Sequence, residues 1–220
     1  MSVLLKTFPF DAVIFDLDGV LADTEMINFR AIQDMFDPQE VRLEDRDFPA
    51  LYGLDYFATA EYLRGRFNLS EAVESLVMRQ EQSALRRLSL ELVPAEGVLD
   101  LIRGLHARGI PLGLASNSPR LYVRHVLDRL GVAAYIPQPV SRDDVDAGKP
   151  DPAPYLAACR RLGQNPAACL AVEDSAVGMQ SALAAGMSVA LVGPEAPEPS
   201  SQRVTRSQNI TQLAAVLLVQ

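Results

Sequence analysis

The sequence predicts an α/β fold, in which helices cover both faces of a doubly wound parallel sheet and a helical segment interrupts the chain after the first strand. Three observations predict it. Several short apolar runs are typical of buried strands, stretches with helical spacing lie between them, and one long stretch has helical patterns only. The 220 residues are 49% hydrophobic, which is enough for one sizeable core plus a small insert and excludes global disorder.

The first strand is predicted at residues 12–15, where AVIF forms an unbroken run of apolar side chains. Such a run, rich in β-branched and aromatic residues, is typical of a strand buried on both faces of a parallel sheet. Asp16 and Asp18 follow it directly, with Gly19 behind them. Carboxylates so close raise each other's pKa, so the pattern indicates a bound cation or acids with chemistry to perform.

Helical patterns fill the stretch that follows, at 25–36, 55–67 and 70–88, and none of it reads as a convincing strand. We therefore expect a helical cap at residues 24–93, inserted into an α/β core made of residues 1–23 and 94–220.

The rest of the core alternates strands and helices. The predicted strands are 110–115, 169–172 and 188–192, and the predicted helices are 96–109, 119–131, 152–163, 176–186 and 209–219. Before the second of these helices, Ser118 is expected to be the N-cap and Pro119 the first helical residue. The alternation predicts a Rossmann-like core, and the Pro- and Ser-rich stretch 194–201 reads as a loop.

Polar side chains collect where the predicted strands end, and ligands of open α/β sheets bind at that edge. Carboxylates are hard oxygen ligands that suit Mg²⁺, whereas a hydroxyl and an ammonium suit the oxygens of a phosphate. A carboxylate beside Mg²⁺ could attack phosphorus in line. The residues expected at this edge are Asp16, Asp18, Ser116, Asn117, Lys149, Glu173 and Asp174.

Four motifs in order resemble those of the haloacid dehalogenase-like superfamily of phosphotransferases. They are DLDGVLADT, the serine of LASNS, the lysine of AGKPDP, and the acidic pair of EDSAVG. A single D-x-D would be weak evidence, but four motifs, each at a strand end or helix start, are specific. The resemblance covers almost the whole chain, and the insert lies where members with a C1-type cap carry theirs.

The resemblance implies a role for each residue. Asp16 would be the nucleophile, and Asp18 would protonate the leaving group and then activate water. Ser116 and Lys149 would bind the phosphoryl group together with Asn117. The Mg²⁺ ion would be held by the Asp16 carboxylate, the Asp18 backbone carbonyl and Asp174, with Glu173 helping through water.

Within the superfamily the chain is similar to β-phosphoglucomutases and sugar-phosphate phosphatases, so the expected substrate is a small phosphorylated metabolite. Thr24 completes the first motif, and mutases carry a histidine four residues later, where this chain has Asn28. Tyr56 stands where mutases carry a cap arginine that grips a second phosphate. We therefore expect net hydrolysis with Thr24, Asn28 and Tyr56 near the substrate, and the phosphosugar mutase is the alternative.

Two alternatives from other classes receive less support. A receiver-type phosphorylation switch also uses acids, Mg²⁺, a hydroxyl and a lysine, but such domains are about half this length and lack the D-x-D spacing. A catalytically inactive binding protein would lack a catalytic residue, and none is missing here.

Composition restricts the partners. The net charge of −8 disfavours nucleic acid and anionic membranes, and the absence of an 18-residue apolar stretch disfavours a membrane span. The apolar stretch at the N-terminus is too short for a signal peptide, so we expect a cytoplasmic protein. In that compartment Cys159 and Cys169 are expected to stay reduced. We also expect the protein to be a monomer.

Overall fold

The fold is described from a computed structural model for residues 9–36, 43–51, 54–194, 196–198 and 201–218. Its sheet has five parallel strands in the order β2-β1-β3-β4-β5. Their bounds are Ala12–Phe15 for β1, Leu112–Leu114 for β2, Cys169–Glu173 for β3, Ser188–Val192 for β4 and Val204–Ser207 for β5. The predicted α/β fold with a parallel sheet is confirmed.

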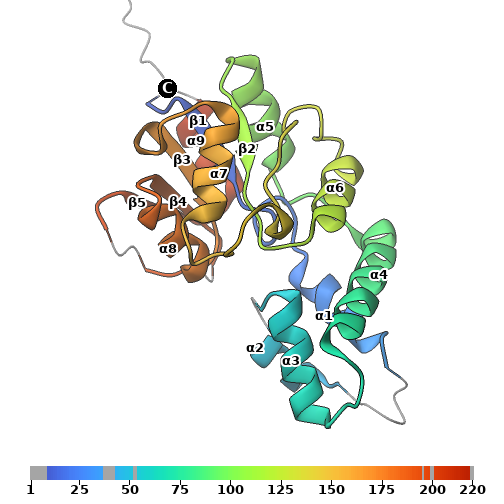
Figure 1. The fold of residues 1–220 in the computed structure, drawn as a ribbon. Coiled ribbons are helices and arrows are strands. Elements are labelled where there is room, and N and C mark those ends of the chain that lie inside the picture. Colours follow the sequence, from blue (N-terminus) through green and yellow to red (C-terminus); the bar gives the residue numbers. More distant parts are fainter. Residues whose placement is uncertain (1–8, 37–42, 52–53, 195, 199–200, 219–220) are drawn as a thin grey trace, which may run out of the picture.

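Helices cover both faces of this sheet (Figure 1). The helices of the core are α5 (Val98–Ala107), α6 (Arg120–Arg129), α7 (Ala153–Leu162), α8 (Ala176–Ala184) and α9 (Ile210–Leu218). Short 3₁₀ turns at Arg142–Asp144 (η2) and Pro166–Ala168 (η3) precede α7 and β3.

Alternate residues of each strand enter two different hydrophobic clusters, as expected for strands buried on both faces. In β1, Val13 and Phe15 pack with α5, α6 and α9, whereas Ala12 and Ile14 pack with α7 and α8. All four side chains are fully buried. The core therefore consists of one apolar layer on each side of the sheet, and its polar groups are left at the strand ends.

The insert between β1 and α5 holds α1 (Glu25–Gln33), η1 (Asp45–Asp47), α2 (Phe48–Leu51), α3 (Tyr56–Phe67) and α4 (Val73–Glu91). These helices lie beyond the carboxyl edge of the sheet and have a small apolar cluster of their own (Figure 1). The two segments that connect them to the core run side by side, since the Ala95 N–H donates to the Leu21 carbonyl at 2.9 Å. No strand occurs among the described residues of the insert.

The structure differs from the sequence prediction at the far edge of the sheet, where β5 was not expected. Val204 is buried, but Thr205 and Arg206 are exposed, so the segment lacks the apolar run that marks the other strands. An edge strand pairs on one side only and can carry a cation outward, which explains why its sequence is polar.

Candidate active site

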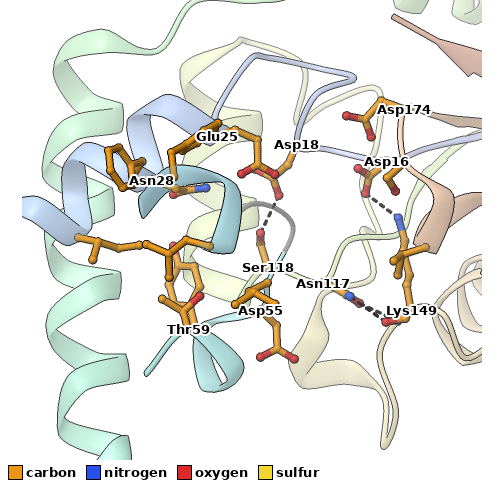
Figure 2. A pocket seen from close by; sticks show the side chains of 18 of the residues that line it. Asp16, Asp18, Glu25, Asn28, Asp55, Thr59, Asn117, Ser118, Lys149 and Asp174 are labelled. Atoms are coloured by element: carbon orange, nitrogen blue, oxygen red, sulfur yellow. Dashed lines mark hydrogen bonds and ion pairs between the residues drawn. The ribbon is translucent and has the colours of Figure 1, made fainter. Parts of the chain in front are cut away.

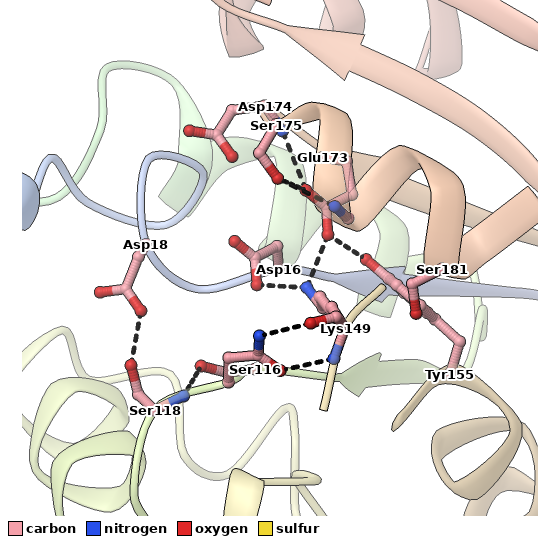
Figure 3. A network of polar contacts seen from close by, with 12 residues as sticks. Asp16, Asp18, Ser116, Ser118, Lys149, Tyr155, Glu173, Asp174, Ser175 and Ser181 are labelled. Atoms are coloured by element: carbon pink, nitrogen blue, oxygen red, sulfur yellow. Dashed lines mark hydrogen bonds and ion pairs between the residues drawn. The ribbon is translucent and has the colours of Figure 1, made fainter. Parts of the chain in front are cut away.

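Lys149 joins two carboxylates that the sequence separates widely (Figure 3). Asp16 follows β1 directly, and Glu173 is the last residue of β3, the neighbouring strand. The Lys149 ammonium lies in the loop before α7, 2.6 Å from Asp16 Oδ1 and 2.6 Å from Glu173 Oε1. All three side chains are nearly or fully buried, so the ion pairs are shielded from water.

Glu173 is fully buried, and four donors surround its carboxylate. Oε1 accepts from Lys149 and from the Tyr155 hydroxyl, both at 2.6 Å. Oε2 accepts from the Asp174 backbone N–H and from Ser175 Oγ, each at 3.2 Å. Since both oxygens are already engaged, Glu173 is built to hold Lys149 in place. The sequence predicted the helix that carries Tyr155, at residues 152–163, but no pattern showed that the Tyr155 hydroxyl reaches this carboxylate.

Two glycines permit the close approach of backbone to carboxylate. A Cβ on Gly178, in α8, would lie 1.9 Å from Glu173 Oε1. A Cβ on Gly19 would lie 1.8 Å from Asp174 Oδ2, and the φ of Gly19 is +76°, in the left-handed region. The glycine of DLDG is therefore required both by its backbone angle and by the carboxylate packed against it.

Asp16, Glu173 and Asp174 form the one cluster of possible metal ligands among the described residues, with ligand atoms within 4.8 Å of one another. Burial raises the pKa of Asp16 and of Asp174 above the ordinary range. The neighbouring carboxylates raise both values further, while Lys149 opposes them. One ammonium does not balance three carboxylates in a buried site, so the donor set fits a hard divalent cation.

The Asp18 carboxylate, although only two residues from Asp16, sits among hydroxyl groups (Figures 2 and 3). Its Oδ2 accepts from Ser118 Oγ at 2.7 Å, and its Oδ1 accepts from the Tyr122 hydroxyl at 3.1 Å and from the Thr24 hydroxyl. In a regular strand, residues two apart share a face, but β1 ends at Phe15 and the chain turns at Leu17–Leu21, so the two acids enter different surroundings. Tyr122 was not identified by sequence analysis.

The prediction that Ser118 caps a helix is wrong. The residue at the N-cap of α6 is Pro119, and the Ser118 hydroxyl donates to Asp18 instead. The first N–H of the helix, that of Arg120, donates to the Asp143 carboxylate at 2.9 Å. A carboxylate of the η2 turn satisfies this helix N–H, so the Ser118 hydroxyl is available to donate to Asp18.

Ser116 and Asn117 follow β2, as predicted, and the structure shows what each contacts. Ser116 is fully buried, and its Oγ accepts the Ser118 N–H at 2.9 Å. The Asn117 side chain accepts from the Lys149 backbone N–H at 2.8 Å and donates to the Lys149 carbonyl at 3.2 Å. Asn117 thus fixes the loop that carries Lys149.

A cavity of about 490 Å³ extends from these groups to the insert (Figure 2). That volume is typical of small-molecule sites. Asp16, Asp18, Lys149 and Asp174 line its core end. Helices α1 to α4 line the other end of the cavity. They contribute Asn28 and Tyr56, which the sequence analysis expected near the substrate. They also contribute Thr59 and Gln80, which it did not expect there. Thr24 is buried beside the cavity and reaches it through Asp18.

Comparisons with known proteins agree with this geometry. The family model described as "haloacid dehalogenase-like hydrolase" matches residues 10–186. The 6-phosphogluconate phosphatase of Escherichia coli (strain K12) is 31% identical over 183 residues, which cover 81% of this chain and 80% of that protein. The fructose-1-phosphate phosphatase YqaB of the same organism is 27% identical, over 81% of this chain and 94% of its own.

Among solved structures, CbbY from Rhodobacter sphaeroides in complex with phosphate superposes with a TM-score of 0.83 at 22% identity. The match covers 93% of this chain and 96% of the other, so the similarity of fold includes the helical insert. No helix in the described part of the chain combines the length and the apolar character that crossing a membrane requires.

Proposed function

The chain belongs to the haloacid dehalogenase-like hydrolase family, and from this premise we propose that it is a Mg²⁺-dependent phosphatase of small phosphorylated sugars or polyols. The observation that carries the proposal is that Asp16 and Asp18, the two carboxylates that follow β1, lie in different surroundings. Asp16 contacts the Lys149 ammonium, whereas Asp18 is held by three hydroxyls. Two carboxylates with separate surroundings can take separate roles in one reaction.

Asp16 is the proposed nucleophile. Lys149 holds its Oδ1, which orients the carboxylate at the core end of the cavity. In the first step a carboxylate oxygen of Asp16 attacks phosphorus, and the bond from phosphorus to the leaving oxygen breaks. The product is an aspartyl-phosphate, and Lys149 lies within reach of its oxygens.

Asp18 is the proposed general acid and base. It gives a proton to the leaving oxygen in the first step and takes one from water in the second, when water displaces Asp16 from phosphorus. The hydroxyls of Ser118, Tyr122 and Thr24 orient the Asp18 side chain between these transfers. Phosphate leaves, and Asp16 and Asp18 return to their starting states.

The metal we propose is Mg²⁺, held by the carboxylates of Asp16 and Asp174, with Glu173 contributing through water because its oxygens are occupied. When bound, it supplies positive charge that offsets the repulsion between Asp16 and the phosphate. The backbone carbonyl of Asp18 completes the proposed set. We further propose that residues 1–23 and 94–220 form the catalytic core and that residues 24–93 form the cap.

The test is phosphate release from p-nitrophenyl phosphate and a panel of sugar phosphates, with MgCl₂ or with a chelator. We expect turnover with Mg²⁺, loss of turnover with the chelator, and no turnover in Asp16→Asn, because an amide is a poor nucleophile and a weak ligand for Mg²⁺. Asp18→Ala should slow both steps by roughly 100-fold or more. Circular dichroism checks that both variants fold. An Asp16→Asn protein with wild-type turnover would refute the assignment.

The phosphosugar mutase is separated from the phosphatase by its product. No described residue lining the cap end of the cavity is an arginine, so the described lining holds no guanidinium to grip a second phosphate. Incubation with β-glucose 1-phosphate and a bisphosphate primer should therefore release inorganic phosphate. Isomerised sugar phosphate with little free phosphate would establish the mutase instead.

A further inference from the structure

Three polar groups at the cap end of the cavity have no hydrogen-bond partner within the described part of the protein. They are Asn28 Oδ1 from α1, the Tyr56 hydroxyl from α3 and Gln80 Oε1 from α4. Tyr56 and Gln80 are 7% and 3% exposed, so bulk water does not satisfy them freely. Buried polar groups nearly always have partners, and groups that line a cavity without one indicate a ligand that supplies it.

These groups lie on the Asp18 side of the cavity. The Tyr56 ring meets the Tyr122 ring edge-on, with centroids 6.2 Å apart, and the Tyr122 hydroxyl donates to Asp18. Asp18 is the residue proposed to protonate the leaving oxygen. The unpartnered groups therefore lie where the organic part of the substrate would be, rather than beside the phosphoryl group.

The charges at this end of the cavity are negative. Glu25 and Asp55 line it, and Lys149 is the one cation among the described lining residues. Lys149 is already shared by two carboxylates at the opposite end. Burial raises the pKa of the Tyr56 phenol, and the charged groups that raise it further, Asp18, Glu81 and Glu25, are all carboxylates. The rest of this wall is largely apolar, including Phe29, Ile32 and Leu51.

We propose that the cavity selects phosphomonoesters of an uncharged polyol or sugar and rejects substrates whose organic part carries a second anion. The inference rests on the proposed phosphatase function and specifies its substrate class. Hydroxyl groups donate and accept, so a polyol can satisfy the Tyr56 phenol and the two amide oxygens. A second carboxylate or phosphate would lie among acids with no described cation to pair it, and like charges in such a site oppose binding strongly.

The test compares two substrates that differ at one carbon. Sorbitol 6-phosphate and 6-phosphogluconate are open six-carbon chains with the phosphate on C6, and C1 is a hydroxymethyl group in the first and a carboxylate in the second. We expect kcat/KM to favour sorbitol 6-phosphate by about 100-fold or more. The 6-phosphogluconate phosphatase of Escherichia coli serves as the positive control for the second substrate. Equal kcat/KM values, or a preference for 6-phosphogluconate, would overturn the inference.

A charge-gain variant tests the position of the selecting groups. Gln80→Lys puts a cation at the cap wall and should shift the ratio of kcat/KM values toward 6-phosphogluconate by about 10-fold or more. Gln82→Lys is the matched control, because Gln82 lies in the same helix with an exposed side chain outside the cavity lining. The control should keep the wild-type ratio. A similar ratio in both variants would mean that Gln80 does not face the substrate and would overturn the placement.

Failure of the specificity and failure of the function give different results. If the protein releases phosphate from p-nitrophenyl phosphate but treats both six-carbon substrates alike, the phosphatase function stands and the inference falls. If it releases no phosphate from any of the three esters, the function falls, and the inference with it. The wild-type ratio decides the inference even if Gln80→Lys does not fold.

Discussion

Gly19→Ala separates the stability of the fold from the integrity of the site. The φ of Gly19 is +76°, where a side chain costs about 1–2 kcal/mol. The new Cβ would also lie 1.8 Å from Asp174 Oδ2. That oxygen is the end of a flexible side chain, so the carboxylate can rotate away and the fold survives. For a protein of this size, a loss of about 1–2 kcal/mol lowers Tm by roughly 2–8 °C.

The effect on activity should be much larger than the effect on stability. A rotated Asp174 removes one of the two carboxylates that we propose as direct ligands of the metal. We expect kcat/KM to fall by about 100-fold or more, which corresponds to about 2.7 kcal/mol of transition-state stabilisation. Thermal unfolding gives the stability, calorimetric titration with MgCl₂ gives the affinity for the metal, and phosphate release gives kcat/KM.

Gly131→Ala is the matched control for backbone strain. Gly131 has a φ of +69°, and a Cβ added there would meet no atom within 4 Å. Its loss of stability should therefore be similar, while Mg²⁺ affinity and kcat/KM stay at wild-type values. If Gly19→Ala also kept them, the Asp174 carboxylate would not be a ligand that the metal needs.

Two predictions concern pH. Burial pushes the pKa of Asp144 up, but hydrogen bonds from Ser141 and the ion pair with Arg161 outweigh it and hold the pKa at about 2, below the ordinary 3.8. A carboxylate with a lowered pKa stabilises the fold above about pH 4, and this stabilisation is lost as the pH falls through about 2. The free energy of unfolding of Asp144→Asn, measured with urea, should therefore be about 1–2 kcal/mol lower than that of the wild type at pH 7. The difference should shrink progressively below about pH 4. An equal loss at every pH would contradict this. The raised pKa values of Asp16 and Asp174 mean that the metal-free cluster keeps a proton near neutral pH, so Mg²⁺ binding should release protons and tighten as the pH rises. Calorimetry in buffers of different ionisation enthalpy measures the release, and identical heats in all of them would exclude it.

The sequence predicted the elements whose signal is local. The run AVIF puts apolar side chains on both faces of a strand, which is typical of a strand buried in a parallel sheet, and β1 was found at the expected residues. The helix predicted at 152–163 was found as α7, and Gly163 ends it in the left-handed conformation. The polar edge strand β5 was missed because an edge strand needs no apolar run, and its pairing with β4 is a long-range fact.

The site also has features that the sequence predicted and features that only the fold decided. The motifs determined which residues carry charge and hydroxyls at the strand ends, and the family model agrees with the resemblance that those motifs carry. Their partners were decided only by the fold. The Tyr155 hydroxyl donates to Glu173. The Ser118 hydroxyl donates to Asp18 and not to the helix predicted after it, whose first N–H donates to Asp143 of the η2 turn.

The sequence by itself therefore determined the α/β architecture, the family and the groups able to do the chemistry, because strand hydrophobicity and motif spacing are properties of neighbouring residues. The tertiary structure alone decided that Lys149 is shared between Asp16 and Glu173. It also decided that Asn28, Tyr56 and Gln80 line one cavity with polar atoms that have no partner among the described residues. These contacts depend on how three or more segments pack in space, so they cannot be predicted from the pattern of any one segment.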